Sequence, residues 1–479
     1  QCILPGVAPV RCTDTPRPCL SLQSEMAMTS VAAHSYPSLN MTMNGLPASS
    51  RYASGGPRPP HGTINALFFD AIERFDRADA LSTKVRGVWE PMSHRTILER
   101  VRCTALGLAD MGIVAQDRVA ILSENRPEWL IADFACICSA ITDVPIYPTL
   151  PADQLPYLLN NSGARAIFVS DAEQAKKVAS IRSEVPGLQW IIGFAATKAD
   201  GCDFTLADIE AKGAAVDSAE RALNFKHDAL AVTPDQLVTL IYTSGTTGFP
   251  KGAQLTHRGS VANIFNIAAM GAITTAAEQK AVALGEVTAA PAPDVAYPPS
   301  FMAPTPLFHV TACNCLLHPA TLVGGKVVMT YKWDPGRALE LIERERITNF
   351  SGVPSMSREL LMHPDWATRD TSSLVGMGGG GSAVQPDLVH KIAGALKTGQ
   401  PSTGYGMTET CGIITANSAR LYIAKPDSCG PLVPTLEGKL VDEDGNDLPP
   451  GPNTVGILCV RGSIVIKGYL NRPEANAET

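Results

Sequence analysis

The sequence lacks the positive charge that most nucleic-acid-binding proteins carry. It has 39 Lys and Arg against 46 Asp and Glu, which gives a net charge of −7 and a pI of about 5.8. Proteins that bind nucleic acid usually present an excess of basic residues on their surface. The acidic balance therefore argues against a nucleic-acid partner.

Long apolar stretches without charged residues are also scarce. The most apolar one, WLIADFACICSAITDVPIYPTL at 129–150, contains Asp133 and Asp143 and ends in prolines. A membrane-spanning helix needs about 20 consecutive apolar residues. This stretch therefore predicts a buried helix followed by a strand rather than a membrane span.

Cysteine spacing typical of a structural zinc site is missing as well. The 12 cysteines are scattered, and the two close pairs, Cys136/Cys138 and Cys313/Cys315, have only one intervening residue. Zinc sites usually have two or more intervening residues and a second pair. We therefore expect small buried apolar side chains in a reducing compartment.

The length and composition favour a large soluble protein. The chain has 479 residues, 45% of them hydrophobic, and a mean hydropathy of +0.06. Such a length predicts two to four structural units with a sizeable core. Residues 1–62 differ from the rest, since they hold nine prolines, 12 Ser and Thr, four Arg and no Lys. This composition predicts a disordered extension, either an organelle transit peptide or a segment without function.

From Thr63 onward, β-rich runs alternate with helical patterns. Thr63 is positioned to cap a first helix, in which apolar residues recur at helical spacing. The β-rich runs are RVAIL (118–122), AIFVS (166–170), WIIGF (190–194) and LVTLIYT (237–243), and helical patterns cover 97–112 and 171–184. This alternation predicts a parallel α/β fold over residues 63–429.

Two later segments have a different texture. Residues 271–300 are rich in Ala and Pro and weakly patterned, which predicts a long surface loop or partial linker. Residues 430–479 contain one short strand before an Asp-Gly turn and then two more in GILCVRGSIVIKGYL. Strands without intervening helices predict a small antiparallel unit, such as a barrel.

The stretch YTSGTTGFPKG at 242–252 directly follows the apolar strand LVTLI. A loop in this position lies at the carboxyl edge of an α/β sheet, where ligands bind. Its glycines allow backbone N–H groups to point at an anion, its hydroxyls add donors, and Lys251 adds a positive charge. The stretch therefore suits a polyphosphate, although it is not the Walker pattern. A solvent-exposed turn is the alternative on composition alone.

A second stretch, GYGMTET at 404–410, offers complementary chemistry. Tyr405 supplies an aromatic face, on which an adenine ring could stack, between two glycines. Thr408 supplies a hydroxyl, and Glu409 supplies a carboxylate of the kind that binds magnesium. A helix start with a buried tyrosine is the alternative interpretation.

Together these motifs resemble the AMP-forming acyl-CoA synthetases of the adenylate-forming superfamily. The resemblance rests on LIYTSGTTGFPKGAQLTH, GYGMTET, TPLFHVTACN (305–314) and GMGGGGSAV (376–384), and it covers roughly residues 63–479. It implies an α/β fold in which two αβα sheets pack together beside a small distorted β-barrel. It also implies that this is the large N-terminal domain of such an enzyme.

The resemblance assigns roles to individual residues. Lys251, Thr408, Glu409 and His309 would be catalytic, with Glu409 and Thr246 at the magnesium ion. The nucleotide would be bound by Thr243, Ser244, Gly245, Thr246, Thr247, Gly248, Gly380, Gly381, Ser382, Gly404, Tyr405, Gly406 and Met407. His309 lies in the segment that lines the acyl pocket in the family, although a packed core histidine is the alternative for this residue.

The implied activity is that of a long- or medium-chain fatty acid–CoA ligase, an AMP-forming acid–thiol ligase. ATP, Mg²⁺ and CoA would be the cofactor and co-substrates, and a fatty acid or related carboxylate the substrate. Two alternatives remain: an enzyme that adenylates aryl or other carboxylates, and a binding module that holds nucleotide or acyl chains without turnover. Their discrimination depends on an acyl pocket that the sequence does not assemble.

The chain ends at GYLNRPEANAET, before the position where family members carry a ribose-binding aspartate and a C-terminal domain with a catalytic lysine. The resemblance therefore implies a truncated chain with impaired turnover. We expect an intracellular, most simply cytoplasmic, protein, with organelle targeting by residues 1–62 as the alternative. Long-chain acids would also be compatible with peripheral membrane association, although no basic amphipathic helix demands it.

Overall fold

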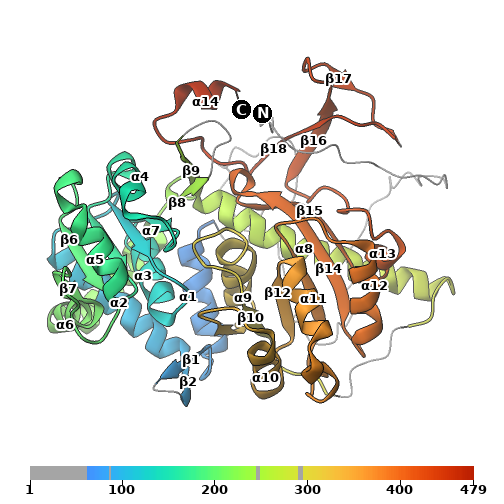
Figure 1. Cartoon of the computed structure of the whole chain (residues 1–479), viewed down its shortest axis with the longest axis horizontal. Helices are drawn as coiled ribbons and strands as arrows, with labels where there is room; N and C mark the ends of the chain where they lie inside the picture. The colour runs from blue at the N-terminus through green and yellow to red at the C-terminus, as the bar shows by residue number, and fades with distance from the viewer. Residues whose placement is uncertain (1–61, 86–87, 244–248, 290–294, 452, 479) are drawn as a thin grey trace.

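The computed structural model describes residues 62–85, 88–243, 249–289, 295–451 and 453–478. The predicted disordered extension therefore lies outside the described residues, apart from Gly62. The first described helix, α1 (Ile64–Phe75), begins where the sequence predicts, because the Thr63 hydroxyl accepts a hydrogen bond from the Ala66 amide at 3.2 Å. The elements that follow form two large sheets and one small one (Figure 1).

The first large sheet has the order β7-β6-β5-β3-β4-β8-β9, and only β9 runs antiparallel to its neighbour. Its strands are β3 (Arg118–Leu122), β4 (Thr142–Ile146), β5 (Ala166–Val169), β6 (Trp190–Gly193), β7 (Phe204–Thr205), β8 (Leu237–Thr243) and β9 (Lys251–Thr256). The helices associated with it are α2 (His94–Asp110), α3 (Pro127–Cys138), η1 (Ala152–Gln154), α4 (Leu155–Ser162), α5 (Ala172–Ser180), η2 (Arg182–Glu184), α6 (Leu206–Val216) and α7 (Ala219–Ala231). The predicted strands and both predicted helices are confirmed.

Alternate side chains of β3 show how this sheet is covered. Val119 and Ile121 pack into a core with α2 and α3, whereas Ala120 and Leu122 pack into a separate core with α4 and α5. Successive side chains of a strand point to opposite faces, so both faces of the sheet are buried. The apolar stretch at 129–150 forms α3 and β4 within these cores, as predicted.

The second large sheet has the order β15-β14-β13-β12-β10-β11-β1-β2, with antiparallel strands only at its two edges. Its strands are β1 (Leu81–Val85), β2 (Val88–Met92), β10 (Ser300–Ala303), β11 (Lys326–Met329), β12 (Asn349–Gly352), β13 (Gly376–Gly380), β14 (Gln400–Met407) and β15 (Gly412–Ser418). The associated helices are α8 (His257–Ala283), η3 (Cys313–Leu317), α9 (His318–Leu322), α10 (Pro335–Glu345), α11 (Pro354–Met362), η4 (Pro364–Ala367), α12 (Pro386–Ala395), η5 (Thr408–Thr410) and α13 (Ala419–Ala424).

A shared helical layer joins the two sheets. One continuous core contains side chains of α1, α3, η3 and α9 together with residues from both sheets, such as Phe168 and Val327. On the far face of the second sheet, Met302 and Phe350 pack with α10, α11 and α12. The fold is therefore two αβα units packed together, as expected, with the first sheet at the left of Figure 1 and the second at the right.

The C-terminal region forms a small antiparallel sheet of β16 (Leu436–Val441), β17 (Asp447–Leu448) and β18 (Ile457–Gly462), followed by α14 (Pro473–Glu478). Gly445 adopts a φ of 86° in the predicted Asp-Gly turn between β16 and β17. Within the described residues these three strands form an open sheet, so the predicted barrel is not confirmed. Only one of the two strands predicted in GILCVRGSIVIKGYL is present. In the second half of this stretch Tyr469 makes a single antiparallel bridge to Ala253, and one bridge does not form a strand.

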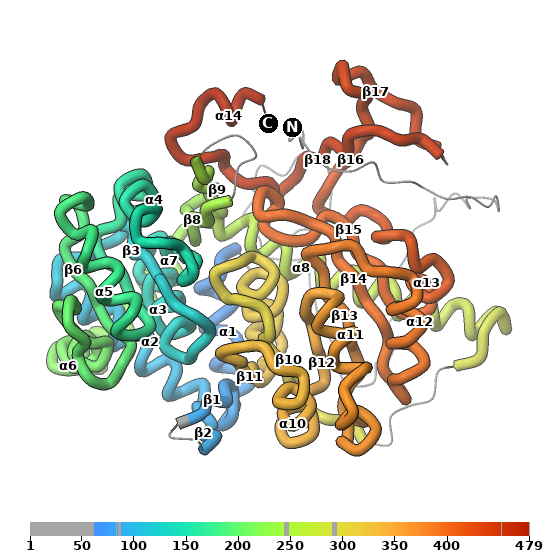
Figure 2. The backbone as a smooth tube through the Cα atoms, in the orientation of Figure 1, coloured from blue at the N-terminus to red at the C-terminus, as the bar shows by residue number. Residues whose placement is uncertain are grey.

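The prediction of a loop at 271–300 is wrong over its first part. Helix α8 continues to Ala283, and Ser300 already belongs to β10. The tube view shows the distal half of α8 extending beyond the second sheet (Figure 2). By length and composition alone this helix could cross a membrane, but 44% of its most apolar window is buried inside the protein. Core helices of soluble proteins have the same property, and the first half of α8 packs in the core.

Candidate active site

Four parallel strands of the second sheet bring most of the predicted site to one edge. Strands β10, β12, β13 and β14 run in the same direction, so their carboxyl ends meet. His309 follows β10, Gly381 and Ser382 follow β13, and Tyr405 lies near the end of β14. The sequence motifs that surround these residues are far apart in the chain but converge at this edge.

The glycines of β13 are needed chiefly by the neighbouring strands. A Cβ atom on Gly378 would lie 2.0 Å from the Ser402 carbonyl oxygen, and one on Gly379 would lie 1.7 Å from that of Gly352. Close packing of the neighbouring strands is therefore enough to require glycine at these two positions. Gly381, with a φ of 84°, then turns the chain out of the sheet, and Ser382 is exposed beside it.

The predicted phosphate loop lies between β8 and β9, at the carboxyl edge of the first sheet. Thr243, the last residue of β8, pairs with Lys251, the first residue of β9. Ser244, Gly245, Thr246, Thr247 and Gly248 lie outside the described residues, so their predicted contacts stay predictions. The two ends of the loop are nevertheless fixed, because the strands on either side are hydrogen-bonded partners.

Glu409 is the centre of a polar group that both large sheets contribute to. Its side chain is largely buried, at 7% exposure. Glu409 Oε1 accepts a hydrogen bond from the Tyr469 hydroxyl at 2.8 Å and a longer one from the Thr243 hydroxyl at 3.5 Å. The Lys251 ammonium lies 5.2 Å from the centre of the Tyr469 ring. The structure thus brings Thr243, Lys251 and Glu409 together as predicted, and adds Tyr469.

The segment that carries Tyr469 is held against β9 by backbone hydrogen bonds. The Leu470 amide donates to the Gly252 carbonyl at 2.8 Å, and the Lys467 amide donates to the Gln254 carbonyl at 2.9 Å. The Ile466 amide donates to the Glu409 carbonyl at 2.9 Å. The Tyr469 hydroxyl therefore reaches Glu409 from a segment whose backbone is hydrogen-bonded to β9 and to Glu409 itself.

Tyr405 is half-buried on β14, where it packs beside Met407. Burial raises the pKa of its phenol above the usual value. The pairing of β14 with β15 shifts register between Tyr405 and Gly406, and a Cβ on Gly406 would lie 1.8 Å from the Gly412 carbonyl oxygen. The bulge changes the direction in which this end of β14 presents its side chains. Gly404 pairs with Gly380 of β13, so the two predicted nucleotide-binding segments are neighbours.

Thr408 and His309 occupy separate places near this edge. Thr408 is buried at the start of η5, directly before Glu409. His309 Nδ1 accepts the Thr311 amide at 3.2 Å and lies 2.9 Å from the Thr311 hydroxyl. Because Nδ1 accepts a hydrogen bond, the neutral ring carries its proton on Nε2, and burial lowers the pKa of His309. Among the described residues, no hydrogen bond joins His309 to Lys251 or Glu409.

Two asparagines that the sequence motifs did not indicate hold these segments in place. Asn125 accepts the Leu307 amide at 2.8 Å and donates to the Thr305 carbonyl at 2.9 Å, so it fixes the segment before His309. Asn263 on α8 accepts the Ile413 amide at 2.9 Å and donates to the Asn314 carbonyl at 2.9 Å. Buried amides so far apart in sequence give no local signal, because their partners are defined only by the fold.

A glycine-rich sequence between β8 and β9, a buried carboxylate in contact with the last residue of β8, and two packed αβα units are the features of an adenylate-forming enzyme. The chain belongs to the AMP-binding enzyme family, which it matches over residues 68–470. It is 31% identical to a feruloyl-CoA synthase of Amycolatopsis over 401 residues, which cover 83% of this chain and 70% of the relative. It is also 31% identical to a long-chain-fatty-acid–CoA ligase of Escherichia coli over 411 residues, which cover 81% and 68%.

Solved structures share the fold at lower identity. The N-terminal domain of FACL13 from Mycobacterium tuberculosis matches with a TM-score of 0.69 at 23% identity, over 87% of this chain and 93% of that one. A long-chain-fatty-acid–CoA ligase (FadD1) from Archaeoglobus fulgidus matches with a TM-score of 0.70 at 23% identity, over 89% and 80%. The protein is therefore an acid–CoA ligase of the adenylate-forming superfamily, and its acid substrate is a separate question.

Proposed function

We propose that this protein activates a medium- or long-chain fatty acid with ATP and transfers the acyl group to CoA. The observation that carries the proposal is the buried Glu409 carboxylate, which faces Thr243 at the base of the predicted phosphate loop, with Lys251 at its other end. A carboxylate of the kind that binds magnesium and a lysine of the kind that binds phosphate, both close to the ends of this loop, support the proposal. A polyphosphate with a hard divalent cation matches that chemistry.

Each residue has a defined role in the first step. The fatty carboxylate oxygen attacks the α-phosphorus of ATP, the bond to pyrophosphate breaks, and an acyl-adenylate forms. Lys251 stabilises the negative charge on the departing pyrophosphate, and the Thr408 hydroxyl contacts the α-phosphate. Tyr405 stacks on adenine, and the backbone of Gly380 and Gly381 contacts the nucleotide.

Glu409 and the hydroxyls near it suit magnesium, since carboxylate and hydroxyl oxygens are the ligands that this ion prefers. When bound, the ion neutralises charge on the phosphates. In the second step the CoA thiol sulfur attacks the acyl carbonyl carbon, the bond to AMP breaks so that AMP leaves, and the thiol proton passes to water. His309 lies in the segment predicted to line the acyl pocket, and its neutral ring orients the carboxylate of the acid substrate through its Nε2–H.

The tested quantity is acid-dependent pyrophosphate release from ATP and magnesium, with short, medium and long fatty acids supplied separately. Release should rise with medium and long chains. Lys251→Ala should lower it by about 100-fold or more, as expected when one positioned donor is lost. Lys467→Ala is the matched control, because Lys467 lies on the neighbouring segment with an exposed side chain.

A second candidate function is ligation of a hydroxycinnamate or related aryl acid to CoA. It is favoured by the similarity to a feruloyl-CoA synthase, which equals the similarity to the bacterial fatty-acid ligase in identity. Ferulate, coumarate and benzoate belong in the same assay. Release with these acids alone would replace the fatty-acid proposal, and no release with any acid despite ATP binding would favour a binding module.

A further inference from the structure

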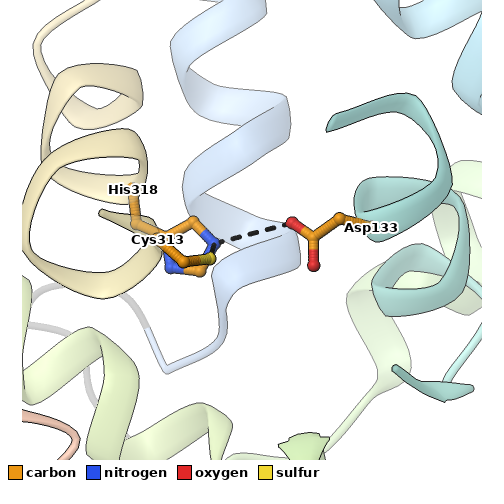
Figure 3. Close-up of side chains that lie close together, drawn as sticks. All are labelled: Asp133, Cys313 and His318. Carbon is orange, nitrogen blue, oxygen red and sulfur yellow. Dashed lines mark hydrogen bonds and ion pairs between the residues drawn. The ribbon is translucent and has the colours of Figure 1, made fainter. Parts of the chain in front are cut away.

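Three metal-ligating side chains converge inside the helical layer between the two large sheets. Asp133 lies on α3, Cys313 begins η3, and His318 begins α9 (Figure 3). The Cys313 sulfur lies 3.5 Å from His318 Nε2, and His318 Nε2 lies 3.8 Å from Asp133 Oδ2. All three ligand atoms lie within 4.8 Å of one another. None of these residues belongs to the candidate active site.

The side chains are sealed from solvent but incompletely satisfied. Asp133 and His318 are 1% and 2% exposed, and Cys313 is 6% exposed. Asp133 Oδ2, which faces His318 Nε2, is buried without a hydrogen-bond partner. Buried polar atoms are normally paired, and each unpaired one costs about 1–3 kcal/mol. Within the described residues, Asp133 also has no lysine or arginine as an ion-pair partner. Burying this cluster without a bound ligand therefore lowers the stability of the folded protein.

The spacing of the ligand atoms suits a tetrahedral ion. Zinc–sulfur bonds of about 2.3 Å and zinc–nitrogen bonds of about 2.0–2.1 Å place sulfur and nitrogen roughly 3.6 Å apart in a tetrahedral site. The Cys313–His318 distance of 3.5 Å already meets this value. In such a site an oxygen ligand should lie roughly 3.3 Å from the nitrogen. Asp133 Oδ2 lies 3.8 Å from His318 Nε2, so a small movement of the carboxylate would bring it to this distance.

The surroundings of Asp133 resemble the outer partners that metal ligands usually have. Asp143 on β4 lies close enough to Asp133 for each carboxyl group to affect the pKa of the other, and burial raises the pKa of both. The Thr239 hydroxyl in turn donates to Asp143 Oδ2 at 3.2 Å. Such outer partners orient a ligand and tune its charge. Asp143, the carboxyl neighbour of Asp133, is thus tied to β8, the strand that leads to the predicted phosphate loop.

We propose that Asp133, Cys313 and His318 bind a divalent transition-metal ion, with zinc as the best match and a water molecule in the fourth tetrahedral position. Sulfur, imidazole nitrogen and carboxylate oxygen together are the donor set that zinc accepts. Binding takes one proton from the Cys313 thiol, and the His318 ring stays neutral. The +2 charge of the ion is then balanced by one thiolate and one carboxylate, which leaves the buried site without net charge.

The site would connect the two halves of the fold. Asp133 belongs to the helix that covers the first sheet, whereas Cys313 and His318 belong to the segment that follows β10 of the second sheet. Asn314, next to Cys313, donates to the Cys411 carbonyl at 3.1 Å, and Cys411 closes the turn that carries Glu409. The ion would therefore act as a cross-link whose loss loosens both the sheet packing and the active-site turn.

The first test is the metal content of the full chain, expressed without a histidine tag and grown with added zinc. Elemental analysis should find roughly one zinc ion per chain. Reconstitution with Co²⁺ should give a thiolate-to-cobalt charge-transfer band and visible bands of a tetrahedral site. Absence of any stoichiometric transition metal in the purified chain, together with no cobalt band, overturns the proposal.

Variants locate the site. Cys313→Ser and His318→Gln should each reduce bound metal by roughly tenfold or more, since even outer-partner changes cost about 10- to 100-fold in affinity. Cys315→Ser is the matched control, because Cys315 lies two residues away on the same turn and contacts Asn263 instead. Loss of metal in the control but not in Cys313→Ser overturns the assignment. Cobalt binding by the unmodified chain decides the question even when a variant fails to fold.

Discussion

The polar group around Glu409 and the cluster around Asp133 contain similar chemistry in opposite settings. Glu409 lies at the carboxyl edges of the sheets, and its oxygen has two hydroxyl partners. Asp133 lies inside the helical layer, with one oxygen unpartnered. The difference suggests that loss of a polar group at the edge should mainly affect chemistry, whereas loss inside the layer should mainly affect stability.

The largest expected effect at the edge is that of Glu409→Gln. The amide keeps the shape and still accepts hydrogen bonds from Tyr469 and Thr243, so the melting temperature should change little. Loss of the charge at the predicted magnesium ligand should lower acid-dependent pyrophosphate release by about 100-fold or more, at least as much as outer-partner changes at metal sites. Kinetics across magnesium concentrations measure this.

Glu474→Gln, an exposed change on α14, is the control for that measurement. Near-normal release by Glu409→Gln would remove Glu409 from the magnesium site. A large fall in the melting temperature of Glu409→Gln would contradict the contrast between the sheet edge and the helical layer, because it would mean that Glu409 chiefly stabilises the fold.

Tyr469→Phe should have an intermediate effect. It removes the 2.8 Å hydrogen bond to Glu409 but keeps the ring beside Lys251. Hydrogen bonds to charged groups contribute about 1.5–3 kcal/mol. Acid-dependent pyrophosphate release should therefore fall by roughly tenfold or more, and a higher magnesium concentration should be needed to reach its maximum. Tyr242→Phe, whose hydroxyl instead bonds to Asn161, is the control. Equal effects of the two changes would argue against a specific role for Tyr469.

The smallest expected effect is that of a change at His257, which is buried in the interior. Its Nδ1 accepts the Ile64 amide at 3.3 Å, and burial, with a smaller effect from His318, lowers its pKa to about 3. The unfolded chain, with a histidine pKa of about 6.5, takes up a proton between those values while the folded chain does not. Stability from this group is therefore full above about pH 6.5 and falls by about 1.4 kcal/mol per pH unit below it.

His257→Asn retains an acceptor for the Ile64 amide and removes the titrating group. Its melting temperature should fall less between pH 7 and pH 5 than that of the parent, while pyrophosphate release at pH 7 should be close to normal. An unchanged pH dependence would show that His257 is accessible to protons in the folded protein. A marked loss of pyrophosphate release at pH 7 would contradict the expectation that changes in the interior affect stability rather than chemistry.

The sequence predicted the fold and part of the site for identifiable physical reasons. Strands such as RVAIL and LVTLIYT are short, apolar and flanked by helical patterns, so their type is set locally. The distal half of α8 was missed because its alanines give helix propensity without an apolar stripe. The glycines of β13 were assigned to ligand contact, although neighbouring strands already require them.

The residues that were missed depend on contacts that no local pattern encodes. Tyr469 meets Glu409 across 60 positions of the chain, and Asn263 meets Ile413 across 150. Cys313 was interpreted as a small buried apolar side chain because its spacing does not fit common zinc motifs, and no motif drew attention to His318. Only the packing of α3 against η3 and α9 brings Asp133 to them.

The pairing of β1 with β11 has a consequence for synthesis on the ribosome. The Arg77 guanidinium, just before β1, donates to the Gly324 carbonyl, just before β11, across 247 positions. At about 5–20 residues per second, roughly 10–50 s pass between the emergence of these two segments. During that interval the edge of β1 that pairs with β11 and the side of α1 that packs against α9 lack their partners, so the nascent chain should depend on chaperones until its second half arrives.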